Sequence, residues 1–230
     1  MLSYRKLAMR VLGRPLHTGG GNDSSRPASQ RAAAFILTAA MLTTLAAPAF
    51  ADTWCIENGN ITVKAGDTEG TNKVSQGTII DKEDTNTVIT GKSDKNTVTI
   101  EAKDEDDKVE VTLKDLNIDA SRGSEAAVSV TGKGDTNIEL NGDNELKSGA
   151  GHAGLEHNKT DTSGELTIQD KDKNGSLEAV GGFKGAGIGS AGSNDAQVKI
   201  TGGNITATSD DWGAGIGSGS DGTAYVEITG

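Results

Sequence analysis

The sequence GAGIGS occurs at residues 185–190 and again at residues 213–218, and the related sequences VKITG and VEITG follow at residues 198–202 and 226–230. Both pairs repeat after 28 residues (213 − 185 = 28; 226 − 198 = 28). A fixed period of this length, with aliphatic residues at alternate positions, is typical of a solenoid in which each repeat is one coil of short strands.

Weaker copies of the same coil extend back to Val111. The first strand of each coil carries a pair of aliphatic residues: Val111/Leu113, Ile138/Leu140, Leu166/Ile168, Val198/Ile200 and Val226/Ile228. A second and a third aliphatic strand follow in the same order, and glycine, asparagine and aspartate stand at the corners between them. We therefore predict an all-β fold, a right-handed parallel β-helix with about 28 residues and three short strands per coil.

One corner is longer than its counterpart in the next coil. Nine positions separate Ile168 from Leu177, whereas five separate Ile200 from Ile205 (177 − 168 = 9; 205 − 200 = 5). Insertions at a corner disturb the stack of coils little, and solenoids often carry function there.

The N-terminal 51 residues differ in composition from the rest. Residues 1–31 carry six basic side chains and one acidic one, residues 32–47 are apolar apart from three threonines, and a small-x-small sequence ends at Ala51. This pattern predicts a secretory signal peptide, because the apolar run is shorter than the roughly 20 residues of a membrane-spanning helix.

The sequence therefore divides into three parts. Residues 1–51 are predicted to be the signal peptide, residues 52–96 an N-terminal cap with the first irregular coils, and residues 97–230 the β-helix coils. The chain stops in mid-coil at Gly230, which indicates either truncation or an exposed last strand.

Removal of the signal peptide leaves an acidic chain. Of 22 basic and 33 acidic residues, 6 and 1 lie in residues 1–51, so 16 and 32 remain and the net charge is near −16. Such a surface repels nucleic acid and anionic lipid and attracts divalent cations. We expect no nucleic-acid partner, no membrane contact after cleavage, and a secreted or extracellular location that includes the cell surface.

A calcium loop is the one cofactor site that the sequence suggests. Asp170, Asp172 and Asn174 place oxygen atoms at positions 1, 3 and 5, and Gly175 follows at position 6. Position 12 is Gly181, where a calcium loop has a bidentate carboxylate. Two interpretations stay open, a Ca²⁺ site and an ordinary acidic corner loop, and we expect no cofactor to be required.

Trp212 and Tyr225 are the candidate binding residues, because aromatic faces stack on sugar rings. Trp212 stands at a corner and Tyr225 on the outward side of a strand. The alternatives are that Trp212 folds over the end of the core and that Tyr225 is a lone exposed aromatic.

The sequence contains few candidate catalytic residues. Arg122, the only arginine after residue 51, lies two coils from the Asp170 loop. His152 and His157 have no cysteine partner for zinc, and we expect both to be solvated corner residues. The prediction is a protein that is not an enzyme.

The run from Val111 to Gly230 resembles the secreted β-helix surface proteins of anaerobic Gram-positive bacteria, which are similar to a carbohydrate-binding family with a pectate-lyase-like fold. Segments that carry the likeness include 144–149, 164–168 and the two GAGIG turns. The resemblance implies a role in binding glycans, and some members of that family bind calcium.

Together these observations predict a secreted or cell-surface, non-catalytic module that binds plant or cell-wall polysaccharide. Two alternatives are a structural adhesin or stalk without glycan affinity and a calcium-dependent polysaccharide lyase.

Overall fold

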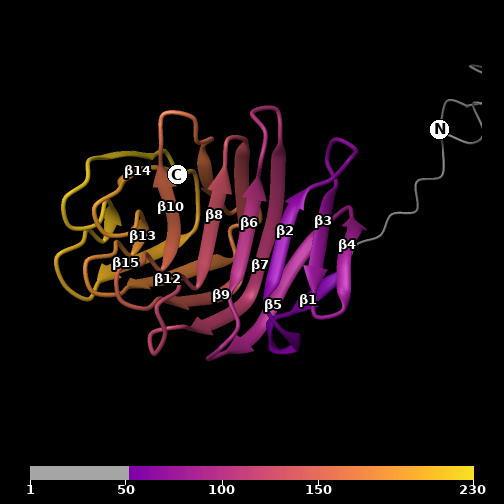
Figure 1. Cartoon of the computed structure of the whole chain (residues 1–230), viewed down its shortest axis with the longest axis horizontal. Coiled ribbons are helices and arrows are strands. Elements are labelled where there is room, and N and C mark those ends of the chain that lie inside the picture. The colour runs from indigo at the N-terminus through magenta and orange to yellow at the C-terminus, as the bar shows by residue number, and fades with distance from the viewer. Residues whose placement is uncertain (1–51) are drawn as a thin grey trace, which may run out of the picture. The chain divides into compact units, whose positions relative to one another are not determined.

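The computed structural model describes residues 52–230, which form a parallel β-solenoid of about five turns (Figure 1). The strands are β1 (Thr53–Cys55), β2 (Ile61–Ala65), β3 (Asn72–Gln76), β4 (Ile79–Asp84), β5 (Thr87–Ser93), β6 (Val98–Ala102), β7 (Lys108–Asp119), β8 (Val128–Gly132), β9 (Asp135–Lys147), β10 (Leu155–Lys159), β11 (Leu166–Gln169), β12 (Gly175–Gly181), β13 (Ile188–Gly189), β14 (Asp195–Ile200), β15 (Asn204–Ser209), β16 (Ile216–Gly217) and β17 (Ala224–Ile228). The predicted parallel β-helix is confirmed.

The one helical element in the described residues is a 3₁₀ turn, η1 (Ile56–Asn58). No helix within residues 52–230 has the length and apolar character needed to cross a membrane. The predicted signal peptide, residues 1–51, lies outside the described residues.

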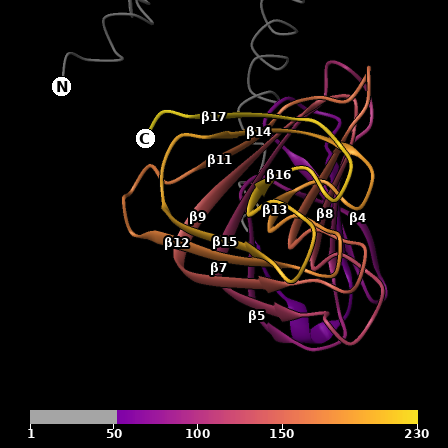
Figure 2. The same cartoon turned by 90° about the vertical axis from the view of Figure 1, so that its left-hand side faces the viewer.

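Each coil contributes a strand to three parallel sheets that surround a common core (Figure 2). The first sheet contains β1, β5, the first halves of β7 and β9, β11, β14 and β17. The second contains the later halves of β5, β7 and β9, with β12 and β15. The third contains β2, β6, β8, β10, β13 and β16.

The first and second strands of a coil are continuous in β7 and β9, and both strands bend at one residue. Asp115 and Gly142 occupy the bends with positive φ angles of 49° and 65°. Just beyond the second bend, Asn144 is 3% exposed, and its Oδ1 accepts a hydrogen bond from Leu116 N at 3.0 Å. Its Nδ2 donates to Ser176 O at 3.1 Å. One buried amide therefore connects three successive coils at this corner.

The aliphatic residues stack in columns inside the coil, as the repeat predicts. Val111 pairs with Ile138 in the first sheet, and Leu155 pairs with Val128 and with Ile188 in the third. Ile138, Val128, Leu155 and Ile188 are each 0% exposed. The core is a stack of small aliphatic layers, which is why a chain with 3% aromatic residues can fill it.

The register of β11 on β9 differs from the prediction by two residues. Leu166 pairs with Thr136, and Ile168 pairs with Ile138; the sequence spacing predicted that Leu166 would lie on Ile138. Gly175, at the end of the long corner, pairs with Gly142 and packs closely against Leu140. The additional corner residues therefore shift the first strand as well as lengthening the turn, an effect that counting aliphatic pairs does not reveal.

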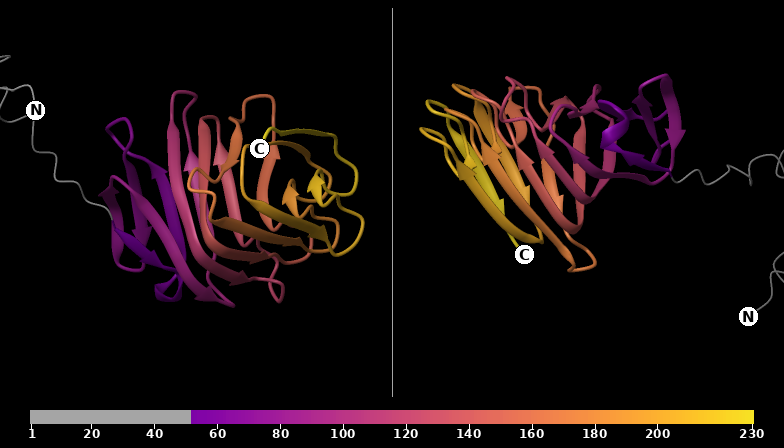
Figure 3. Two further views of the ribbon diagram at one scale, coloured as in Figure 1. Left: turned by 180° about the vertical axis from the view of Figure 1, so that it is seen from behind. Right: turned by 90° about the horizontal axis from the view of Figure 1, so that it is seen from below.

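Antiparallel strands close the N-terminal end of the solenoid, where β2 pairs with β3 and β3 with β4 (Figure 3). Trp54 is 4% exposed, and its Nε1 donates a hydrogen bond of 2.7 Å to Oδ2 of the fully buried Asp84. This hydrogen bond joins the first coil to the end of β4.

Burial decreases toward the C-terminal coil. Val198 and Ile200 of β14 are 0% and 4% exposed, whereas their partners Val226 and Ile228 of β17 are 36% and 61% exposed. The last described strand therefore shields the core less than the strands before it.

Candidate functional site

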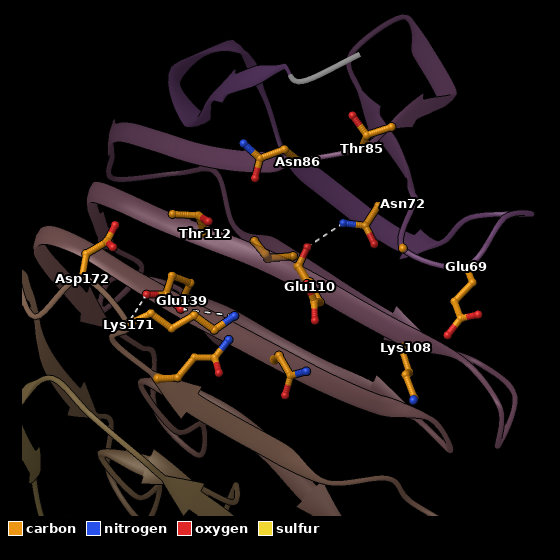
Figure 4. Close-up of a pocket in the computed structure, with 14 residues that line it drawn as sticks. Glu69, Asn72, Thr85, Asn86, Lys108, Glu110, Thr112, Glu139, Lys171 and Asp172 are labelled. Carbon is orange, nitrogen blue, oxygen red and sulfur yellow. Dashed lines mark hydrogen bonds and ion pairs between the residues drawn. The ribbon is translucent and has the colours of Figure 1, made fainter. Parts of the chain in front are cut away.

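A groove of about 490 Å³ crosses the outer face of the first sheet (Figure 4). Outward-facing residues of β7 and β9 form its floor, including Thr112 and its ladder partner Glu139. The segment around Asn72 and Asn86 borders it on one side, and Asp172 of the long corner on the other. We call this feature the polar groove.

Glu139 attaches the long corner to the floor of the polar groove. Its Oε1 accepts a hydrogen bond of 2.6 Å from the backbone N–H of Lys171, and the Lys171 Nζ lies 4.0 Å from Oε2. Oε2 is buried and has no hydrogen-bond partner within the described residues. The lysine is therefore held against this carboxylate by its backbone and by its charge.

Asn72 fixes the opposite side of the polar groove. Its Nδ2 donates hydrogen bonds to Thr87 Oγ1 at 2.9 Å and to the Glu110 carbonyl oxygen at 2.7 Å. The lining carries four carboxylates (Glu69, Glu110, Glu139 and Asp172) and two ammonium groups (Lys108 and Lys171), a net charge of −2. Its side chains can hydrogen-bond a polar ligand, and the lining contains no histidine or cysteine.

In the predicted calcium loop, backbone N–H groups of the loop itself donate hydrogen bonds to the Asp170 carboxylate. Asp170 Oδ1 accepts a hydrogen bond from Asn174 N, and Oδ2 accepts one from Gly175 N, both at 3.1 Å. Asp172 lines the polar groove with Glu139. Within residues 52–230 no group of three or more His, Cys, Asp or Glu side chains is placed to hold a metal. Calcium at Asp170, Asp172 and Asn174 stays a prediction.

The two predicted aromatic residues are exposed on different sides of the coil. Trp212 is 71% exposed at the corner between β15 and β16, so it does not fold over the core. Tyr225 is 63% exposed and stands on β17 beside Gln197 of β14. Sequence reasoning missed Phe183, which is 45% exposed one coil before Trp212.

One corner repeats its backbone conformation in three successive coils. Gly151, Lys184 and Trp212 occupy this corner with φ angles of 87°, 69° and 68°. Hydrogen bonds to the following coil recur there, from Gly151 N to Phe183 O and from Lys184 N to Asp211 O, both at 2.8 Å.

His152 and His157 have different environments. His157 is 2% exposed and faces inward beside Val130, so the prediction that it is a solvated corner residue is wrong. Burial lowers its pKa, partly opposed by the contact of Nδ1 with the Gln197 carbonyl oxygen at 3.2 Å. Its spacing from Leu155, two residues earlier on an inward position, was the signal for burial. His152 is partly exposed and contacts Glu156.

Comparison with known proteins gives one family assignment. A family model described as the RFX5 DNA-binding domain matches residues 6–164, which are 159 of the 230 residues (164 − 6 + 1 = 159). No curated protein and no solved structure matches the chain.

This match overturns the resemblance to secreted β-helix surface proteins and the prediction of a carbohydrate-binding, secreted module with a polysaccharide partner. The shared corner glycines and core aliphatics are needed by any such coil, so they do not discriminate function. The prediction of no nucleic-acid partner is contradicted as well. That prediction counted charge after removal of residues 1–51, whereas the match includes the basic residues from position 6 onward. Because the match covers more than half of its length, the chain belongs to the RFX5 DNA-binding domain family.

Proposed function

We propose that the chain binds DNA through the basic segment at residues 5–31, while the acidic solenoid stays outside the contact. The family match supports this proposal, because it begins at residue 6 and therefore includes five of the six basic residues of that segment. The single observation that carries the proposal is the segregation of charge along the chain.

The charges of the two parts are opposite in sign. Residues 1–31 carry six basic side chains and one acidic one, a net charge of +5, whereas residues 52–230 carry a net charge near −16 (16 − 32 = −16). Contacts between cationic side chains and phosphates supply most of the sequence-independent affinity for DNA. The basic segment can make such contacts, and the solenoid as a whole repels phosphate.

Several lysines of the solenoid are already paired with carboxylates. Lys73 Nζ lies 2.5 Å from Asp67, and Lys82 Nζ lies 2.6 Å from Asp52. A bound phosphate would have to compete with these carboxylates, which further favours the N-terminal segment as the contact.

The proposal is tested by fluorescence anisotropy with labelled duplex DNA over a range of salt concentrations. We expect the full chain to bind with a slope of log K against log salt of up to about −5, the value for six phosphate contacts. DNA binding should be lost when glutamine replaces the six basic residues of the segment: Arg5, Lys6, Arg10, Arg14, Arg26 and Arg31.

The matched control removes the same charge from the solenoid. The control leaves the basic segment intact and replaces six solenoid lysines by glutamine: Lys92, Lys95, Lys103, Lys114, Lys133 and Lys171. Both variants then have the same net charge of −17 (−11 − 6 = −17). We expect this control to keep the salt slope of the unmodified chain. Absence of binding at low salt, or equal loss in both variants, rules the proposal out.

A further inference from the structure

A second groove, of about 320 Å³, lies on the outer face of the third sheet. Residues of β6, β8 and β10 and of the turns before β8 and β10 line it, among them His152, Glu156 and Ser129. We call it the histidine groove. The proposed DNA contact does not use these residues.

His152 and Glu156 form a hydrogen-bonded pair in the histidine groove. His152 Nδ1 lies 2.8 Å from Glu156 Oε2, and the glutamate side chain is 7% exposed. The same oxygen accepts a hydrogen bond of 3.1 Å from Ala153 N, and Oε1 accepts one of 3.2 Å from Asn158 Nδ2. Three donors thus fix the carboxylate and, through it, the imidazole.

The pairing determines which imidazole nitrogen is available as a base. A carboxylate at Nδ1 stabilises the tautomer with the proton on that atom, and Nε2 then carries the free lone pair. Within residues 52–230 Nε2 of His152 has no hydrogen-bond partner, and the side chain is 33% exposed. The free nitrogen can therefore accept a proton from a neighbouring group.

Ser129 lines the histidine groove together with this pair. It is the ladder partner of Glu156 between the parallel strands β8 and β10, so both side chains stand on the same face, about 4.8 Å apart at the backbone. The Ser129 hydroxyl makes no hydrogen bond within the described residues, and its neighbours Val128 and Val130 face the core. A nucleophile, a base and a buried carboxylate thus line one groove.

We propose that the histidine groove hydrolyses small esters, with Ser129 as nucleophile, His152 as general base and Glu156 as the positioning residue. Ser129 Oγ forms a bond to the acyl carbon while its proton passes to His152 Nε2. The carbon–oxygen bond to the alcohol then breaks, and the alcohol takes the proton from His152. A water molecule releases the acid by the same steps.

The negative charge of the groove lining determines which esters the groove can accept. Glu125 also lines the histidine groove, so an anionic acyl group would meet a second carboxylate there. The groove therefore favours neutral or cationic esters with a short acyl chain, in keeping with its volume.

The proposal is tested with a fluorophosphonate probe on the full chain. Ser129 Oγ should form a bond to phosphorus with loss of fluoride, and peptide mass spectrometry should find the adduct on Ser129. We expect Ser129→Ala to abolish labelling, His152→Gln to slow it by about 100-fold or more, and Ser124→Ala, in the same groove, to leave it unchanged.

The positioning role of Glu156 has its own readout. Glu156→Gln removes the carboxylate that orients the imidazole and should slow labelling, and Glu156→Asp, which keeps a carboxylate, should restore part of the rate. Absence of an adduct on Ser129 in the folded chain overturns the proposal. An unchanged labelling rate in His152→Gln, with native circular dichroism, overturns it too, whether or not Glu156→Gln folds.

Discussion

His157 is an imidazole in an otherwise aliphatic column of the core. Val63, Ile100 and Val130 precede it at the same inward position of successive third-sheet strands. Burial holds its pKa below the ordinary value of 6.5, and its Nδ1 contacts a carbonyl oxygen of β14. The native state therefore keeps this side chain neutral at pH values where the unfolded chain binds a proton.

We expect the free energy of unfolding to fall as the pH drops from about 7 to about 5. Above pH 6.5 both states carry a neutral His157, so it gives no pH dependence. Below 6.5 the unfolded state binds a proton that the native state excludes, and stability is lost until the native pKa is reached. Urea unfolding of His157→Leu should show a flatter profile in this window.

A carboxylate variant separates this effect from acid denaturation. Hydrogen bonds from the Thr223 backbone N–H and hydroxyl hold the pKa of Asp195 below its ordinary value of 3.8. Its contribution is present above that value and is lost only as the pH falls below it. Asp195→Asn should leave the window from pH 7 to 5 intact, and an identical slope in His157→Leu would contradict the prediction.

Alternation along a strand predicts which way a residue faces, but it does not predict contacts between coils. The outward position of Tyr225 and the corner position of Trp212 follow from the repeat. The pairing of Glu139 with Lys171 does not, because the two residues are joined across a corner of irregular length. The sequence alone therefore does not predict the polar groove, because its lining depends on the register of β11 on β9.

At the level of strands, the long corner after β11 depends on a residue without a side chain. A Cβ on Gly175 would lie 2.5 Å from the Leu140 Cβ and 2.7 Å from the Leu140 carbonyl carbon and oxygen. The close approach of the two chains allows β12 to begin directly above β9, with Gly175 paired to Gly142. Any larger residue must push this backbone apart.

We expect Gly175→Ala to lower the free energy of unfolding by about 1–3 kcal/mol, the usual cost of an overpacked core. The matched control is Gly192→Ala, because the atom nearest to its added Cβ is the Gly151 carbonyl oxygen at 4.0 Å. Urea unfolding monitored by circular dichroism measures both. Equal stability of the two variants would show that the corner can relax.

The stacking of regular coils was predictable, whereas the exceptions to the stack were not. The sequence NTV occurs at residues 86–88 and 96–98, and each copy leads into a strand, β5 and β6. The antiparallel pairs β2–β3 and β3–β4, and the antiparallel contact of β10 with β14, have no counterpart in the repeat. A repeat predicts which strands will pair, because equivalent segments of successive coils stack on one another. These antiparallel segments occur only once in the sequence, so the repeat does not predict their partners.

For the solenoid as a whole, the decline of burial from β14 to β17 implies a gradient of local stability. Each coil contacts the coils next to it, so the free energy of local opening depends on how well each neighbour is shielded. Ile138 and Leu140 of β9 are fully buried between neighbouring coils, and Ile228 of β17 is 61% exposed.

We expect native-state hydrogen exchange to show this gradient directly. Backbone amides of β7 and β9 should exchange slowest, and those of β17 fastest among the strands, because opening β17 exposes the least additional apolar surface. Mass spectrometry of peptic fragments resolves the strands separately. Uniform protection from β7 to β17 would indicate a single cooperative unit instead.

At the corner occupied in successive coils by Gly151, Lys184 and Trp212, the backbone conformation is the same although the side chains differ. Glycine, a cation and a large indole occupy it in turn while the backbone keeps the same left-handed conformation. Because the hydrogen bonds between coils use backbone atoms there, this conformation does not depend on which side chain is present. Such a corner offers a site of neutral variation: mutation can exchange one outward-facing group for another, and with it one partner for another, without refolding the coil.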